Sequence, residues 1–368
     1  MRSRVIGAAL FGVGVLVLVF AGGLAFVVAP QVDRLPYDLE RTQSVAEAPN
    51  ARFLQITEGR AEVNQATLRS TVTVQPDAKE TANLDGPLDG EAVVWLVGQE
   101  VIRTDTEDLI SAYSTALALD RRTGAARSWD KQWLDTGNDR QRVNYSGQIY
   151  KFPFGTEKKT YQIFDRDINA TQPAHFVKTE QINGLETYQF TQEIRDATQP
   201  LPADRLQLLA SQLLPGATTG QIRYSNTRSV WVEPTTGQFI KVQETQRKNL
   251  VGDNGQETVI LDAVFTYTDD TIARSAEAAG SNRRLLQTVK LWGPIALLVV
   301  GLALVIVGLR QALRGPRAAA VDGSVPEPRS GRHAAPVSAS VGKPEASAGR
   351  TEPAAPPADR DRQQTSDG

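Results

Sequence analysis

The hydropathy pattern of this chain contains two apolar runs without a single charge, Val5–Val28 and Leu291–Leu309. A helix that crosses the hydrocarbon core of a bilayer needs about 20 apolar residues, so each run predicts a transmembrane helix. The first run could instead be a cleaved signal peptide, but the apolar part of such peptides is only about 7–15 residues long. We therefore favour an uncleaved anchor at residues 5–28 and a second span at residues 291–309.

Basic residues beside the two runs predict their orientation, because positive charge is favoured at the cytoplasmic ends of membrane helices. Arg2 and Arg4 precede the first run, and Arg310, Arg314 and Arg317 follow the second. On the other side of the second run lie Arg283, Arg284 and Lys290, which weaken the bias. The first helix usually dominates, so we expect a two-pass plasma-membrane protein. Residues 1–4 and 310–368 are then cytoplasmic, and residues 29–290 form an extracytoplasmic domain.

Between the two runs, apolar and polar residues alternate with a period of two, which is typical of β-strands. The alternation is clear in Thr71–Val74, Ala92–Val97 and Thr187–Thr191. Leu117–Gly124 and Ser229–Val242 predict hairpins, because in each an acidic residue follows the first strand and Thr-Gly closes the turn. The extracytoplasmic domain is therefore predicted to be mainly β. The shared turn suggests two related β lobes, residues 31–150 and 151–270.

Helical patterns are scarce outside the two spans. Leu201–Leu214 has an amphipathic spacing of leucines and ends before Pro215. Asp269 or Asp270 is placed to cap a juxtamembrane helix that runs into the second span, with Gly280-Ser281 as its expected bend. From residue 310 the chain is rich in Ala, Pro, Ser and Gly and has no aromatic residue. Such a composition predicts a disordered cytoplasmic tail.

Composition excludes several classes of function. The formal net charge of −2 is against nucleic acid as a partner, because phosphate binding needs a positive excess. The chain has no Cys and two His, which excludes thiolate chemistry and a multi-His metal site. His175 lies in a polar stretch that is typical of a surface loop. No catalytic, cofactor-binding or metal-binding residue is therefore predicted, and we expect a protein that is not an enzyme.

One acidic stretch keeps a metal open as an alternative. Asp165-Arg166-Asp167 resembles the opening of a calcium loop, but the later glycine and glutamate of an EF-hand are replaced by Ala170 and Phe176. A turn between two strands is the favoured interpretation of this stretch. The same holds for Gly252–Gly255, whose Asn-Gly suits a tight turn.

The aromatic residues of the β region are the remaining chemical resource. Most strand aromatics belong to a core, but a lobe with an open apolar face could instead hold a lipid. The candidates for an apolar ligand-facing surface are Trp95, Trp129, Phe154, Tyr161, Phe164, Tyr188, Phe190 and Trp231.

Several segments together resemble the actinobacterial porin PorA family. They are Lys151–Tyr161 (KFPFGTEKKTY), Ile182–Tyr188 (INGLETY), Val230–Gly237 (VWVEPTTG) and Leu291–Pro294 (LWGP). The resemblance covers about residues 1–312 and leaves the tail outside. It implies an actinobacterial cell-envelope protein in a family named after a channel-forming member, and it brings no catalytic residue.

Three functions are compatible with this sequence. In the first, which we favour, the tethered β domain binds or passes an apolar envelope component such as a lipid. The layout is similar to that of the scavenger-receptor group, in which two terminal anchors surround a β-rich, lipid-conducting domain. In the second, the chain forms a channel as a homo-oligomer, because two helices cannot enclose a water-filled pore. In the third, the protein is an envelope scaffold whose tail recruits a partner.

Overall fold

The computed structural model describes residues 2–137 and 140–313, which form a mainly β protein with a long apolar helix before and after its strands. Helix α1 (Arg2–Gly23) continues through a π-helical turn (Leu24–Val28) and a 3₁₀ turn (Ala29–Gln31). Helix α4 (Asp269–Gln287) leads through a second π-helical turn (Thr288–Trp292) into α5 (Gly293–Leu313). Both helical segments are long and apolar enough to cross a membrane. The predicted tail lies outside the described residues from position 314 onward.

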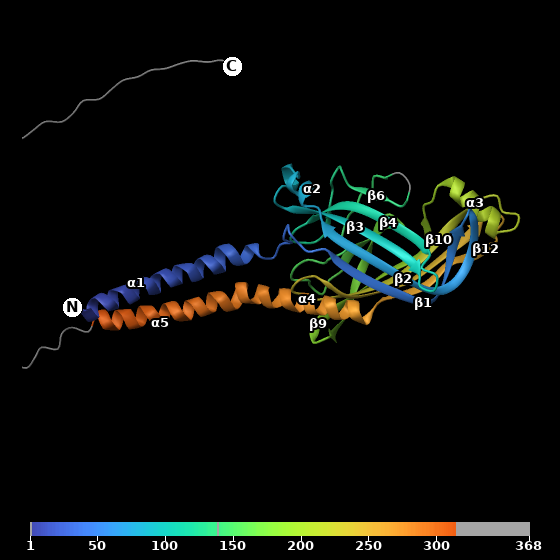
Figure 1. Ribbon diagram of the computed structural model, residues 1–368. Coiled ribbons are helices and arrows are strands. Elements are labelled where there is room, and N and C mark those ends of the chain that lie inside the picture. The colour runs from blue at the N-terminus through green and yellow to red at the C-terminus, as the bar shows by residue number, and fades with distance from the viewer. Residues whose placement is uncertain (1, 138–139, 314–368) are drawn as a thin grey trace, which may run out of the picture. The chain divides into compact units, whose positions relative to one another are not determined.

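Helices α1 and α5 lie side by side and pack through glycines (Figure 1). A side chain added at Gly308 would come within 2.7 Å of the Gly7 carbonyl oxygen, and one at Gly14 within 3.0 Å of the Gly301 carbonyl oxygen. Small residues of this kind let two helix backbones approach closely, and van der Waals packing is the main force that joins helices in lipid. The close approach leaves no water path between α1 and α5.

Gly308→Val is therefore expected to destabilise the helix pair. The new side chain would meet backbone atoms of α1, and overpacking of this kind costs about 1–3 kcal/mol. Gly12→Val is the matched control, because an added Cβ at Gly12 meets no atom within 4 Å. Thermal unfolding of the full chain in lipid nanodiscs measures both variants, and an equal loss of stability in the two would contradict this helix interface.

The twelve strands belong to one antiparallel sheet built from two meanders. The first meander contains β1 (Thr42–Thr57), β2 (Arg60–Pro76), β3 (Ala92–Arg103), β4 (Leu109–Asp120) and β5 (Ala126–Arg127), with β6 (Trp133–Asp135) also paired to β4. The second contains β7 (Tyr161–Asp165), β8 (Ala170–Ile182), β9 (Leu185–Gln199), β10 (Gly220–Val232), β11 (Phe239–Gly252) and β12 (Glu257–Tyr267). Pairing of β1 with β12 joins them, for example Ala46 opposite Tyr267. The ranges predicted as two lobes thus hold one meander each, and their relation by duplication stays a prediction.

The sheet curves and its two ends are bridged. Register shifts interrupt several strand pairs, among them β1–β2 between Ala48 and Ala51, and such bulges bend strands and increase their twist. At one end of the sheet, the amide of Ala126 donates to the Gly147 carbonyl (2.8 Å). At the other end, the Gln148 amide donates to the Gln162 carbonyl (2.7 Å) and the Phe164 amide to the Gln148 carbonyl (2.9 Å). Residues 147–156, here named the closing segment, therefore connect β5 with β7.

The closing segment is held between the two hairpin turns predicted from sequence. The Phe152 amide donates to the Gly237 carbonyl (2.8 Å) of the β10–β11 turn, and the Phe154 amide to the Arg122 carbonyl (3.4 Å) of the β4–β5 turn. The Lys151 ammonium lies between them and donates to the carbonyls of Phe152 (2.8 Å) and Thr236 (2.5 Å). Burial lowers the pKa of Lys151 to about 7.

The two turns have the same construction. In the first, the Asp120 carboxylate accepts hydrogen bonds from the amides of Arg122 and Thr123. In the second, the Glu233 carboxylate accepts from the amides of Thr235 and Thr236. The glycine that ends each turn has a positive φ, which is why the sequence repeats Thr-Gly there.

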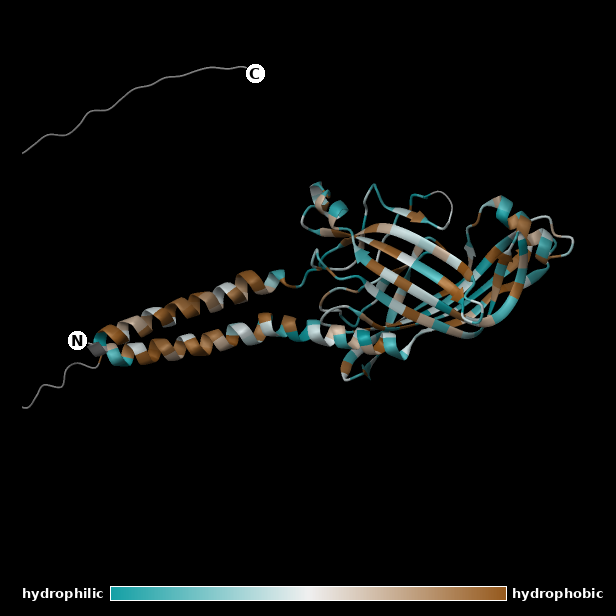
Figure 2. Cartoon of the chain, in the orientation of Figure 1, coloured by the Kyte–Doolittle hydropathy of each residue, from teal (hydrophilic) through white to brown (hydrophobic). Residues whose placement is uncertain are grey.

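Exposed large apolar side chains are concentrated on α1 and α5. Figure 2 shows that hydrophobic residues predominate along both helices. Among the described strand residues, only Ile56, Leu109, Val177 and Val264 are both large, apolar and exposed, and they lie on four different strands. A sheet in contact with lipid would need a continuous apolar band on its outer surface. The strands carry no such band within the described residues.

Two short helices and one cap complete the fold. Helix α2 (Ala78–Ala82) lies in the connection between β2 and β3, and α3 (Ala203–Leu213) confirms the predicted amphipathic helix. The predicted cap of α4 is wrong: Thr268 caps it by accepting from the Thr271 amide, and both aspartates lie within the first turn. The bend predicted at Gly280-Ser281 is also wrong, because Gly280 is a regular residue of α4 and lies beside Leu185. The helix becomes irregular only at the π-helical turn Thr288–Trp292.

Candidate functional site

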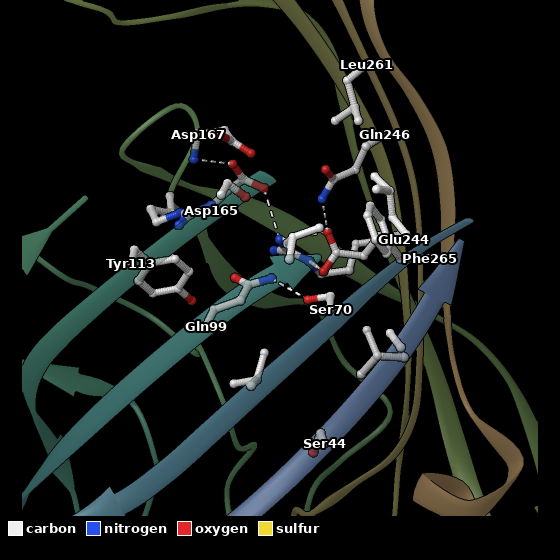
Figure 3. Close-up of a pocket in the computed structure, with 18 of the residues that line it drawn as sticks. Ser44, Ser70, Gln99, Tyr113, Asp165, Asp167, Glu244, Gln246, Leu261 and Phe265 are labelled. Atoms are coloured by element: carbon white, nitrogen blue, oxygen red, sulfur yellow. Dashed lines mark hydrogen bonds and ion pairs between the residues drawn. The ribbon is translucent and has the colours of Figure 1, made fainter. Parts of the chain in front are cut away.

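A cavity of about 430 Å³ lies on the concave side of the sheet, and Figure 3 shows part of its lining. Its walls come from both meanders: β1 to β4 on one side, and β7 with β10 to β12 on the other. Strands that are far apart in sequence can share one cavity because the curved sheet brings its two ends together at the closing segment.

One wall of the cavity is apolar. Phe53 and Leu68 form the buried centre of this wall, together with three alanines of β1 and β12. Around them pack Val101, Leu261 and Phe265, which also line the cavity. Side chains of this kind supply the surface that hydrocarbon prefers.

Polar side chains also line the cavity. We name these residues the polar belt: Ser44, Ser70, Gln99, Tyr113, Asp165, Arg166, Asp167, Arg228, Glu244, Gln246 and Lys248. In Figure 3, Ser70, Gln99 and Tyr113 of β2 to β4 face Asp165, Glu244 and Gln246 across the cavity. The Gln99 amide group donates to the Ser70 hydroxyl (2.7 Å). The cavity is thus amphipathic, with an apolar wall beside a charged one.

Arg228 is the centre of the charged wall. Its guanidinium pairs with Glu244 (2.9 Å) and Asp165 (3.1 Å) and donates to the side-chain oxygen of Gln192 (3.0 Å). Asp165 is 1 % exposed and also accepts from the Tyr224 hydroxyl (3.2 Å). Every charged group at this centre therefore has at least two partners, as buried charges require.

The charged groups of this centre shift one another's pKa values. Burial opposes the charged form of Glu244, but the positive charge of Arg228 together with hydrogen bonds from Arg228, Gln246 and Asn226 holds the pKa of Glu244 below its usual value. At Asp165, burial outweighs the same attraction and raises the pKa above its usual value. Burial opposes the charge of Arg228 too, yet Glu244 and Asp165 raise its pKa. Arg228 is therefore a permanent cation.

The turn between β7 and β8 brings two further charges into the cavity wall. Lys248 of β11 pairs with Asp167 (2.8 Å), which also accepts from the Gln199 side chain (2.8 Å). The guanidinium of Arg166 lies over the ring of Tyr113, 3.8 Å from its centroid. Gln192, a fully buried residue of β9, fixes the hairpin by donating to the carbonyls of Ile163 (2.7 Å) and Gln172 (3.1 Å).

The Asp165–Ala170 stretch is therefore the turn favoured from sequence. Its two aspartates are engaged by Arg228 and Lys248. Over residues 2–137 and 140–313, no group of three or more His, Asp or Glu side chains is placed to hold a metal ion. His175 lies exposed on β8, where its Nδ1 is 3.0 Å from the Thr160 hydroxyl.

The eight aromatic residues proposed from sequence are not gathered at one surface. Phe164 lines the cavity, and Trp129 lines a second groove formed by β2 to β4. The remaining six belong to packed regions. Trp95 and Phe154 pack in one apolar cluster, Tyr161, Tyr188 and Phe190 pack in another, and Trp231 donates from its indole to Glu180 (3.0 Å).

Sequence reasoning missed most of the polar belt. A signal was present in β11, where Glu244, Gln246 and Lys248 occupy every second position. Residues with this spacing share one face of a strand. Taken alone, such a face is assigned to solvent, because charged residues are almost never fully buried unless they are paired.

Comparisons with known proteins all identify the same family. The family model described as Porin PorA matches residues 6–310. A Porin PorA of Corynebacterium resistens is 22 % identical over 406 aligned positions, which cover 86 % of this chain and 98 % of that protein. A Porin PorA of Corynebacterium amycolatum is 24 % identical over 257 positions, covering 58 % of this chain and 62 % of that protein. The matched region contains both apolar helices and all the strands, so the chain belongs to the Porin PorA family.

Proposed function

We propose that this chain is a membrane-anchored protein whose sheet holds an apolar or amphipathic molecule of the cell envelope in its interior cavity. The observation that carries the proposal is the cavity itself, because the apolar side chains of Val101, Leu261 and Phe265 line it and are only partly buried. Ligand-binding cavities of proteins typically measure about 300–1,000 Å³ and combine apolar walls with a few polar groups. The volume of about 430 Å³ falls in that range.

In this proposal α1 and α5 lie in the bilayer and the sheet stands in water on the outer side. The distribution of exposed apolar side chains supports it, because they cover the helices and are scattered on the strands. Arg4 before the apolar part of α1 and Arg310 after that of α5 favour cytoplasmic positions for both ends.

The proposal predicts that filling the cavity displaces its contents. Leu261→Trp places a larger ring in the cavity, and a ligand that shares the reduced space is destabilised by about 1–3 kcal/mol, the usual cost of overpacking. Lipid that copurifies with the full chain in mild detergent should therefore fall roughly tenfold, as quantified by native mass spectrometry. Val264→Trp, an exposed position of the same strand, should leave the bound lipid unchanged. Wild-type protein that carries no bound molecule would refute the proposal.

A channel is the second candidate, and family membership is the observation that favours it. Relatives carry the name porin, and a porin is a protein that conducts solutes. Because α1 and α5 pack closely, a pore in the membrane would have to form between several copies of the chain. Conductance steps from the purified full chain in planar lipid bilayers would support this candidate, and their absence at oligomer-forming concentrations would exclude it.

A further inference from the structure

One cation of the polar belt has no partner of its own. The guanidinium of Arg166 lines the cavity and stacks on the ring of Tyr113. Within the described residues, no carboxylate lies within 4.0 Å of it, and its nitrogens make no hydrogen bond to another side chain or to the backbone. Arg166 is half-buried, so its five donors can bind water or a molecule held in the cavity.

The nearby carboxylates do not fill this role, because other cations engage them. Asp165 and Glu244 pair with Arg228, and Asp167 pairs with Lys248. Side-chain amides and the Tyr224 hydroxyl occupy further lone pairs of these three carboxylates. Among the described residues, the donors of Arg166 therefore have no acceptor from the protein, and the side chain lines the cavity.

Apolar surface lies in the same cavity. Phe53, Leu68, Val101, Leu261 and Phe265 line it together with Arg166 and the hydroxyl-bearing Tyr113. A neutral hydrocarbon would use the apolar wall but would offer the guanidinium no acceptor in place of water. A small free anion would use the guanidinium but would leave the apolar wall in water. A molecule with both parts satisfies both surfaces.

We propose that the cavity takes an amphiphile with one anionic head, a carboxylate or a phosphate, which Arg166 binds while the hydrocarbon chain lies on the apolar wall. This inference rests on the proposed function and specifies its ligand. A guanidinium matches the planar oxygens of a carboxylate or phosphate with two parallel hydrogen bonds, so it selects the charged head over a neutral one of equal length.

Photo-crosslinking of the full chain in nanodiscs tests the inference with matched probes. The probes are a 16-carbon carboxylic acid, the corresponding alkyl phosphate and the corresponding alcohol, each with a diazirine near the end of the chain. Mass spectrometry then maps the crosslinked peptides. We expect the acid or the phosphate to label β12, which carries Leu261 and Phe265, roughly tenfold more than the alcohol does.

Three variants assign the preference to Arg166. Arg166→Gln should reduce labelling by the anionic probes to the level of the alcohol, and unchanged alcohol labelling shows that the cavity is intact. Arg166→Lys keeps the charge but loses the two parallel hydrogen bonds, so it should keep a reduced part of the preference, even if Arg166→Gln disturbs folding. Arg195→Gln is the control, because Arg195 is exposed and pairs with Glu193 at the surface.

The outcomes separate the inference from the proposed function. Equal labelling of β12 by all three probes, or a preference that survives in Arg166→Gln, would overturn the anionic head while leaving a lipid-holding cavity. Labelling by the anionic probes in Arg166→Lys as low as in Arg166→Gln would also overturn it, because the positive charge would then contribute nothing. If no probe labels β12 above the level of exposed strands, the proposed function itself fails.

Discussion

Replacing Arg228 with methionine is expected to lower the free energy of unfolding by about 3–5 kcal/mol, because removal of one partner leaves buried charges without compensation. Asp165 and Glu244 would both lose their cation, and little water could replace it, least of all at Asp165. The side chain of Asp165 is 1 % exposed and that of Glu244 is 19 % exposed. Chemical denaturation of the full chain in detergent, followed by tryptophan fluorescence, measures the loss.

Arg247→Met is the matched control on the neighbouring strand β11. Arg247 pairs with Asp262 at 3.4 Å, but both side chains are about half exposed. Exposed ion pairs contribute about 0–1 kcal/mol, so this variant should unfold nearly as the wild type does. Similar losses in the two variants would show that the Arg228 centre is not the buried network described above.

Gly237→Ala is expected to disrupt the connection between the closing segment and the β10–β11 turn. Gly237 has a φ of +72°, and an added Cβ would meet the carbonyl oxygen of Phe152 and lie 2.6 Å from that of Pro153. These are backbone atoms that hold the sheet closed, so they cannot move without breaking the Phe152–Gly237 hydrogen bond. We expect a loss of about 3 kcal/mol or more, in the range of severe single substitutions.

Gly255→Ala separates the effect of the clash from that of backbone strain. Gly255 has a φ of +79° in the β11–β12 turn, but an added Cβ there meets no atom within 4 Å. Only the strain of the left-handed conformation remains, which costs about 1–2 kcal/mol. If thermal unfolding shows the same shift for both alanine variants, the closing segment does not depend on its contact with Gly237.

Local features of this fold follow from the sequence because they depend on neighbouring residues. The membrane-length helices follow from uninterrupted apolar runs, and the strands from alternation. The turns at Asp120–Gly124 and Glu233–Gly237 follow from an acidic side chain that caps amides and a glycine that accepts positive φ. Local rules still leave the cap of α4 ambiguous. Aspartate and threonine both suit a helix N-cap, so the sequence favours Asp269 or Asp270, whereas the structure uses Thr268.

Long-range features could not be derived in this way. Alternation shows that the two faces of a strand differ, but it does not show which strand pairs with which. The pairing of β1 with β12 and the bridging of β5 to β7 through Gln148 join residues far apart in the chain. The segment KFPFGT, quoted above for its family resemblance, belongs to this closure. No pattern of neighbouring residues predicts that this segment closes the sheet.

The candidate site was the hardest feature to predict, for a physical reason. A search for a lipid site favours aromatic residues, but most of these are needed to pack the core, as Phe190 and Tyr161 do. The cavity is instead bounded by charged residues that look solvent-facing in sequence, such as Glu244 and Lys248. Their burial is possible only because partners from β10 and from the β7–β8 turn reach them, and those partners cannot be identified before the sheet is known.

The central claim of this account is that the helices contact lipid while the strands stand in water around a cavity. The chain has no native cysteine, so single cysteines can be introduced and labelled with the polarity-sensitive fluorophore bimane. In nanodiscs, the emission of each label then reports whether its site is in lipid or in water. The sites are Val177 and Val264 on strands and Val299 on α5, which are 52 %, 41 % and 60 % exposed. The account predicts aqueous emission and iodide quenching at Val177→Cys and Val264→Cys, and lipid-like emission at Val299→Cys. Lipid-like emission from both strand sites would contradict it, because the strands would then form a wall within the bilayer.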